Sequence, residues 1–206
     1  KFAARPHAVF PASVAVVRVQ APGYKSATAQ TYGQGEFSIV TTRDVEGDHF
    51  QRLLKLPMLR GIAPVSRLLV PQNLSGLIDL REAAATAKAD MLLIYTFDTV
   101  FETQDKAAPL TLVSLGLFPT HNVRLVSTAS AILVDTRSGY LYGVAEATSK
   151  DDRQTSAWTT EAAIESERLQ TESEAFEKLV DELEKMWVAV VREQTAVPQP
   201  VPGHLR

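Results

Sequence analysis

Three acidic residues stand where carboxylates could cooperate in acid–base chemistry. Asp98 follows a strongly apolar segment, Asp135 ends another, and Glu146 lies on the strand expected to return after Asp135. Paired carboxylates act as general acid and base when their surroundings push their pKa values apart. Asp135 also begins a turn sequence, however, and a turn is a sufficient role for an aspartate. A hydrolase-like enzyme using strand-end carboxylates is therefore the alternative hypothesis, and no catalytic residue is assigned.

The other residues capable of chemistry match no motif. The chain contains four histidines, which are His7, His49, His121 and His204. No two of them have the i, i+4 spacing of a helical zinc site, and the chain has no cysteine. Gly33-x-Gly35 lacks the third glycine of a dinucleotide-binding loop, and no serine lies in a Gly-x-Ser-x-Gly context. The sequence predicts no metal, no cofactor and no enzyme activity.

Composition and charge limit the classes of partner that the chain could bind. The chain has 206 residues, 45% of them hydrophobic and 22% charged, which suits one globular domain. The net charge is −3 and the positive charges are scattered, so no basic stripe is available for nucleic acid. The segment from Thr160 to Glu184 is acidic, which we interpret as the solvated face of a helix, with a partner-binding face as the alternative.

The apolar patterns predict an α/β (α+β) fold: a mixed β-sheet with helices packed on it. Met91–Phe97 has no charge at all, which favours a central strand buried on both faces. Other strands are expected at Ser13–Gln20, Phe37–Thr42, Ile62–Val70, Val123–Asp135 and Tyr140–Ser149. The last two should form a hairpin, because Asp135-Thr136-Arg137-Ser138-Gly139 joins them with typical turn residues.

Helical spacing of apolar residues predicts three helices that cover the sheet. The first is Asp44–Leu56, and the second is Gly76–Ala89, with an apolar side that includes Leu77, Ile78 and Leu80. The third is Ser173–Val191, the second half of a helical region from Trp158 to Glu193 that we expect to break near 170–173. Trp187 should be buried against the sheet.

Proline-containing flexible tails are predicted on both sides of a single domain. Residues 1–12 include Pro6 and Pro11 and read as an N-terminal tether, and residues 194–206 read as a C-terminal tail because prolines there cannot continue a helix. The domain then spans residues 13–193, with an insertion at residues 98–122.

The insertion is the predicted partner-binding surface. Pro109 and Pro119 bracket a segment dense in apolar side chains, and exposed apolar patches usually mark a protein contact. The predicted partner-binding residues are Leu110, Leu112, Leu115, Leu117 and Phe118. The alternative is that this segment folds back and adds an ordinary strand to the core.

A resemblance to known proteins rests on three stretches. They are Val14–Val17, the run Ala89–Phe97, and Leu133–Tyr142 with its V-D-x-x-S/T-G hairpin. Together they resemble bacterial envelope lipoproteins: the curli secretion pore lipoprotein, the outer-membrane activators of penicillin-binding proteins, and the rhombotarget lipoproteins. The chain has no cysteine to acylate and its insertion is too short for transmembrane hairpins.

The resemblance implies a location and a kind of function. It implies a non-enzymatic periplasmic lipoprotein domain, attached to the outer membrane by a lipid anchor outside the visible chain. It also implies a protein partner in the cell envelope, and it supplies no catalytic residue. A structural assembly subunit, a homo-oligomer built through an exposed sheet edge, is a further alternative.

Overall fold

The computed structural model describes residues 4–22, 24, 26–102, 107–109, 124–151 and 161–196. Eight strands form one sheet, ordered β10-β9-β7-β1-β4-β2, with β5 also pairing β1 and β8 pairing β7. The strands of this sheet are β1 (Ala12–Gln20), β2 (Thr31–Tyr32), β4 (Ser38–Val40), β5 (Leu59–Pro64), β7 (Met91–Glu102), β8 (Ala107–Pro109), β9 (Arg124–Asp135) and β10 (Leu141–Asp151). Two short strands, β3 (Gln34–Gly35) and β6 (Asn73–Leu74), pair separately. The helices are α1 (His49–Leu53), the 3-10 helix η1 (Arg67–Leu69), α2 (Leu77–Thr86) and α4 (Glu161–Ala196).

The charge-free segment lies at the centre of the sheet, as predicted. β7 pairs parallel with β1, from Val14↔Met91 onward, and antiparallel with β9 along its whole length. β9 and β10 form the predicted hairpin, since the Asp135 amide donates to the Tyr140 carbonyl across the turn. The expected mixed sheet with packed helices is therefore confirmed.

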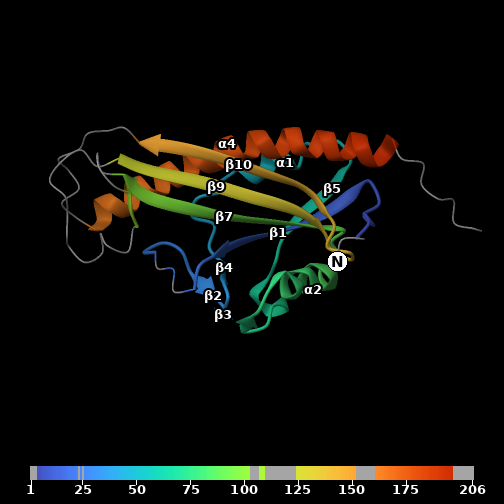
Figure 1. Ribbon diagram of the computed structural model, residues 1–206, viewed down its shortest axis with the longest axis horizontal. Coiled ribbons are helices and arrows are strands. Elements are labelled where there is room, and N and C mark those ends of the chain that lie inside the picture. The colour runs from blue at the N-terminus through green and yellow to red at the C-terminus, as the bar shows by residue number, and fades with distance from the viewer. Residues whose placement is uncertain are drawn as a thin grey trace, which may run out of the picture.

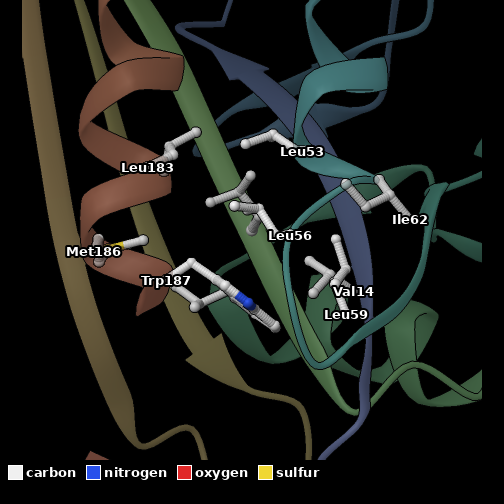
Figure 2. Close-up of a pocket in the computed structure, with 10 residues that line it drawn as sticks. Val14, Leu53, Leu56, Leu59, Ile62, Leu183, Met186 and Trp187 are labelled. Carbon is white, nitrogen blue, oxygen red and sulfur yellow. The ribbon is translucent and has the colours of Figure 1, made fainter. Parts of the chain in front are cut away.

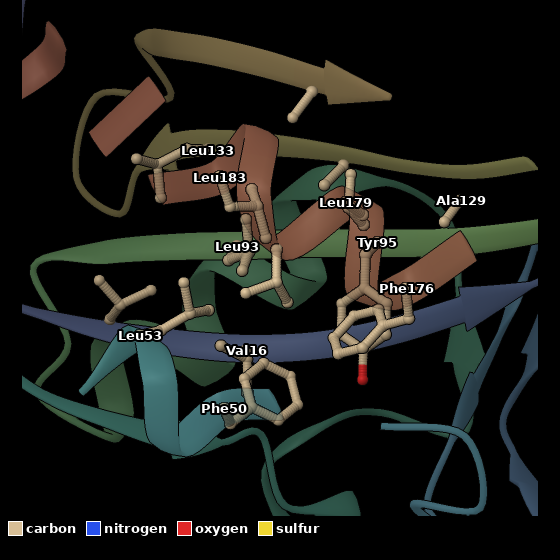
Figure 3. Packing of buried hydrophobic residues seen from close by; sticks show 14 of the residues in the cluster. Val16, Phe50, Leu53, Leu93, Tyr95, Ala129, Leu133, Phe176, Leu179 and Leu183 are labelled. Carbon is tan, nitrogen blue, oxygen red and sulfur yellow. The ribbon is translucent and has the colours of Figure 1, made fainter. Parts of the chain in front are cut away.

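Helix α4 covers one face of the sheet (Figure 1). Its apolar side, which includes Phe176, Leu179 and Leu183, packs against inward-facing residues of the central strands such as Leu93 and Tyr95 (Figure 3). These strand residues alternate with those of the other face, because successive side chains of a strand point in opposite directions. The alternation explains why β7 must be apolar throughout.

Helix α2 lies on the opposite side of the sheet from α4 (Figure 1). A second core cluster joins Leu80, Ala83 and Ala84 of α2 to Leu92 and Ile94 of β7. Helix α2 has only 10 residues, so it covers only part of this face. Farther along the same strands Asp98 is exposed, which is usual for a sheet that meets water on one side.

Several predicted elements have different bounds, and two of them differ most. The strand predicted at Ile62–Val70 is β5, which begins earlier and ends at Pro64, where the missing proline N–H weakens a ladder. The chain then turns into η1, whose first turn is capped by the Ser66 hydroxyl accepting the Leu68 amide. The helix predicted at Asp44–Leu56 is only α1, because Gly47 has a positive φ of 46° that a right-handed helix does not adopt.

The predicted break in the last helix is wrong. Helix α4 runs without interruption through residues 170–173. Two side-chain hydrogen bonds span this stretch, from Arg168 to Glu172 and from Gln170 to Glu174, and each joins residues one helical turn apart. Thr171 and Glu172 are buried there, so packing against the sheet also holds the helix together where the sequence looks polar.

Part of the N-terminal segment lies against the domain. The His7 and Ala8 amides donate to the Asp135 carboxylate, at 2.7 and 2.9 Å. The Phe10 ring meets Trp187 of α4 edge to face, with 5.8 Å between centroids. Residues 7–10 therefore join the hairpin to the last helix.

Candidate functional site

The structure does not bring together the three carboxylates considered for acid–base chemistry. Asp135 pairs with Met91 at one end of β7, whereas Asp98 lies seven residues farther along that strand. At ~3.3 Å per residue this separation is about 23 Å. Glu146 is exposed on β10, and its Oε2 accepts a hydrogen bond from the Ser130 hydroxyl at 3.0 Å. Asp135 therefore does not pair with Asp98, and the hypothesis of an enzyme using strand-end carboxylates stays untested.

Asp135 holds the hairpin and the N-terminal segment together. Its two oxygens accept five hydrogen bonds of 2.7–2.9 Å, from the amides of His7, Ala8, Arg137 and Ser138 and from the Tyr142 hydroxyl. Burial alone would raise the pKa of Asp135, but these donors outweigh it and the pKa is lowered. A carboxylate occupied in this way is a structural anchor.

The described residues include no group of three or more side chains that could hold a metal ion. Of the four histidines, His7 and His49 lie within the described part of the chain. The His49 ring packs edge-on against Phe176, with 5.9 Å between ring centroids. His121 and His204 lie outside the described residues.

A buried ionic cluster lies between the sheet and the first half of α4. It consists of Arg18, Asp44, Glu46, Glu165, Arg168 and Glu172. Glu172 Oε2 accepts from both arginines, at 3.2 Å from Arg18 and 2.5 Å from Arg168. Arg18 also contacts Asp44 at 2.9 Å. The side chains of both arginines are 1% exposed.

Neutral side chains complete the cluster. The Tyr95 hydroxyl donates to Glu46 at 2.8 Å, and the Thr99 hydroxyl donates to Glu172 at 2.9 Å. Ser26 donates to Glu165 at 2.7 Å. Burial opposes ionisation of Glu165, but hydrogen bonds from Arg168 and Ser26 outweigh it and lower its pKa to about 2. Burial likewise opposes the charge on Arg168, yet its bond to Glu165 and the charge of Glu172 raise its pKa.

The ionic cluster joins segments distant in the chain. Arg18 comes from β1, Asp44 and Glu46 from the loop before α1, and the other three residues from α4. Buried charges are tolerated when each has a partner, and an unpaired one is costly. The arrangement is a joint that fixes α4 on the sheet. It corrects our interpretation of the acidic segment at Glu172, which is only 1% exposed, whereas Glu177 and Asp181 are exposed as expected.

An apolar surface lies on η1 and the start of α2. This η1–α2 surface consists of Leu68, Leu69, Leu77 and Ile78, which are exposed by 85%, 37%, 37% and 51%. We predicted Leu77 and Ile78 on the buried side of the helix, but the buried residues of α2 are Leu80, Ala83 and Ala84. The buried face is displaced around the helix, which leaves the two large side chains of the first turn facing out.

A small cavity lies under α4 (Figure 2). Side chains from α1, β5 and α4 line it, among them Leu53, Ile62, Met186 and Trp187. Its volume is about 30 Å³. Cavities that bind a ligand the size of benzene are roughly 150 Å³, so this one is a packing gap in the core.

The predicted partner-binding residues Leu110, Leu112, Leu115, Leu117 and Phe118 lie outside the described residues. β8 leads into that segment and pairs with the end of β7, at Val100↔Pro109. Their role in binding stays a prediction. No helix in the described part of the chain is both long enough and apolar enough to cross a bilayer.

The sequence matches no protein-family model and no curated protein. Three solved structures are similar in part. Protein XCC0632 from Xanthomonas campestris, of family DUF330, has a TM-score of 0.44 and 8% identity, over 95% of this chain and 92% of that one. Lipoprotein GNA1162 from Neisseria meningitidis has a TM-score of 0.35 and 14% identity, over 90% and 99%. Hypothetical protein CT253 from Chlamydia trachomatis has a TM-score of 0.39 and 10% identity, over 86% of this chain and 98% of that one. None of the three is described as a rhombotarget, curli-secretion or penicillin-binding-protein-activator lipoprotein, and likenesses this low transfer no function.

Proposed function

We propose that this chain is a non-enzymatic domain of the bacterial cell envelope that binds a protein partner through the η1–α2 surface. The observation behind the proposal is the exposure of four large aliphatic side chains on η1 and on the first turn of α2. Scattered single apolar residues are normal on a surface, whereas a group of them marks a contact site.

The sequence around this surface supports a protein contact. Between Arg67 and Asp79 the chain has no charged residue, and depletion of charge is typical of the centre of a protein interface. Leu74 and Leu80 are buried beneath, at 0% and 2% exposure, so the surface stands on packed elements. A membrane-binding surface would be expected to carry several basic and aromatic side chains, and this segment has neither.

The proposed location is the periplasm, with a lipid anchor to the outer membrane outside the visible chain. The sequence resemblance to envelope lipoproteins supports it, through the Ala89–Phe97 run and the Leu133–Tyr142 hairpin. The experiment is to express the full-length gene in its own host with a clickable fatty acid. Incorporation of the label and recovery in the outer-membrane fraction are expected, and an unlabelled product would contradict the proposal.

The binding proposal is tested by site-specific photo-crosslinking in envelope extract. A photoreactive residue at Ser75, which is exposed and lies between η1 and α2 in the sequence, is expected to capture a discrete protein. Leu68→Asp with Ile78→Asp should reduce capture at least tenfold while the melting temperature stays within a few degrees. The control is Ala85→Asp, an exposed position near the other end of α2. Equal capture by the folded double variant and by wild type would contradict the proposal.

The predicted surface at residues 110–118 is tested in the same experiment. Leu115→Asp with Phe118→Asp is expected to weaken capture if this segment also contacts the partner. Unchanged capture by these folded variants would remove the segment from the binding surface and leave the η1–α2 surface as proposed.

A further inference from the structure

Strand β10 forms one end of the sheet. It pairs antiparallel with β9 from Leu141↔Val134 to Asp151↔Leu125, and no strand of the described residues pairs with its other edge. Figure 1 shows β10 beside α4 at the margin of the sheet. Such an edge presents backbone N–H and C=O groups that another extended segment can bind.

One hydrogen bond shows which residues point their backbone groups outward. Lys178 of α4 donates to the Thr148 carbonyl oxygen at 3.2 Å, so this group is directed away from the β9 ladder. Residues of an antiparallel strand alternate between facing the partner strand and facing away. Val144 and Glu146 therefore also present their N–H and C=O groups to the open side.

The two halves of this edge differ in protection. In the half beyond Ala147, Lys178 donates a hydrogen bond to the Thr148 carbonyl, and Lys150 adds a second positive charge. Lysines at an edge strand commonly prevent another strand from pairing with it. In the half from Gly143 to Ala147, here called the open edge, no side-chain donor of the described residues contacts an outward carbonyl. Within it Val144 is 65% exposed.

We propose that the open edge binds an extended segment of another protein as an added strand. Val144 and Glu146 project from the same face, two residues apart, and both are exposed. The matching segment has an apolar residue beside Val144 and a basic residue beside Glu146, separated by one position. Specificity comes from these two side chains, and the main-chain hydrogen bonds supply affinity.

The length of the open edge distinguishes this occupant from a second copy of the chain. A stable dimer buries ~1,200–2,000 Å² in total, and pairing of about five residues falls far short of that area. A short extended segment needs only the few outward backbone groups and one apolar contact. This surface is separate from the η1–α2 surface, so the two proposals can fail independently.

The experiment measures binding of two fluorescent heptapeptides to the whole chain by anisotropy. The first, Thr-Lys-Thr-Val-Thr-Lys-Thr, offers the basic and apolar residues in either strand direction, and the second has Glu in place of both Lys. The Lys peptide is expected to bind at least tenfold more tightly. Glu146→Lys should reverse this preference, and Val144→Lys should weaken binding of the Lys peptide at least tenfold. No binding of the Lys peptide to wild type would overturn the proposal.

Three controls separate strand addition from charge attraction and from other surfaces. A Lys peptide N-methylated at its central Val lacks one main-chain donor and is expected to lose most of its binding; unchanged binding would overturn the proposal. Thr148→Ser, on the other half of the same strand, should bind like wild type. The double variant Leu68→Asp and Ile78→Asp should also bind the Lys peptide normally, whatever its effect on the crosslinked partner. Sedimentation should show a monomer, and a dimer abolished by Val144→Lys would assign the edge to a second copy instead.

Discussion

The indole nitrogen of Trp187 donates a hydrogen bond to the carbonyl oxygen of Pro57, 2.8 Å away. This bond ties the last helix to the segment that follows α1, and Trp187 is only 4% exposed. Phe10 packs against the indole edge to face. One side chain thus joins the N-terminal segment, the α1 region and α4, which confirms the predicted burial of Trp187.

Removing this side chain should destabilise the whole domain. Trp187→Ala deletes a buried aromatic ring next to an existing cavity, and we expect a loss of ~3–5 kcal/mol in the free energy of unfolding. Trp187→Phe keeps most of the packing and loses the hydrogen bond, for a smaller cost of ~1 kcal/mol beyond the change in ring size. Urea unfolding measures both. Val188→Ala, at an exposed neighbour, should change stability little, and equal effects at 187 and 188 would contradict this packing.

The elements that the sequence predicts well are those specified locally. The central strand follows from Met91–Phe97, because a charge-free run of that length has to be buried on both faces. The hairpin follows from Asp135 and Gly139, because they supply the turn chemistry. The open face of α2 was missed: Leu77 and Ile78 fit the apolar spacing, and only the tertiary position of Leu80, Ala83 and Ala84 shows which side is buried.

The ionic cluster could not be found by local reading, because its partners are far apart. Arg18 and Glu172 are separated by 154 residues. One signal was present: Arg18 is the only charged residue of a mostly apolar strand, and it shares the inward face of Val14 and Val16. A charge at such a position requires buried partners of opposite sign. The sequence alone does not show which of the acidic residues of α4 supply them.

Breaking one member of the ionic cluster should cost more than any surface charge change. Arg168→Met leaves Glu165 and Glu172 without their closest cation, and loss of one partner of a buried pair typically costs ~3–5 kcal/mol. The double variant Arg168→Met with Glu172→Gln should be less destabilised than the sum of the single effects, since the stranded charge is removed. The exposed pair Lys185–Glu182 serves as the control, and Lys185→Met should leave the free energy of unfolding nearly unchanged. Strict additivity would contradict the coupling.

Acid should weaken the same cluster through Glu165. The pKa of Glu165 is lowered to about 2 in the folded chain from an ordinary value of 4.5, so its carboxylate favours the folded state above pH 4.5. That contribution is lost as the pH falls from about 4.5 towards 2. Wild type should therefore lose stability steeply in this range, and Glu165→Gln should lose less. Glu182→Gln, on the exposed side of α4, should retain the wild-type slope in urea titrations between pH 2 and 5.

Asp135 should control the order of the hairpin and of the N-terminal segment together. Asp135→Asn replaces one acceptor oxygen with an NH₂ group, which then faces amides or the Tyr142 hydroxyl that now donate to the carboxylate. We expect faster amide exchange at His7, Ala8, Arg137 and Ser138 than in wild type, measured by NMR, and a lower melting temperature.

The difference between the variant and wild type should depend on pH. Because the pKa of Asp135 is lowered in the folded chain, its carboxylate stabilises the folded state above pH 3.8, and this stabilisation is lost as the pH falls below that value. The stabilities of the variant and of wild type should therefore converge in acid. Asp98→Asn, at the exposed far end of β7, should change neither exchange nor stability. Accelerated exchange in the hairpin alone, with His7 and Ala8 unaffected, would show that the N-terminal segment is not held by Asp135.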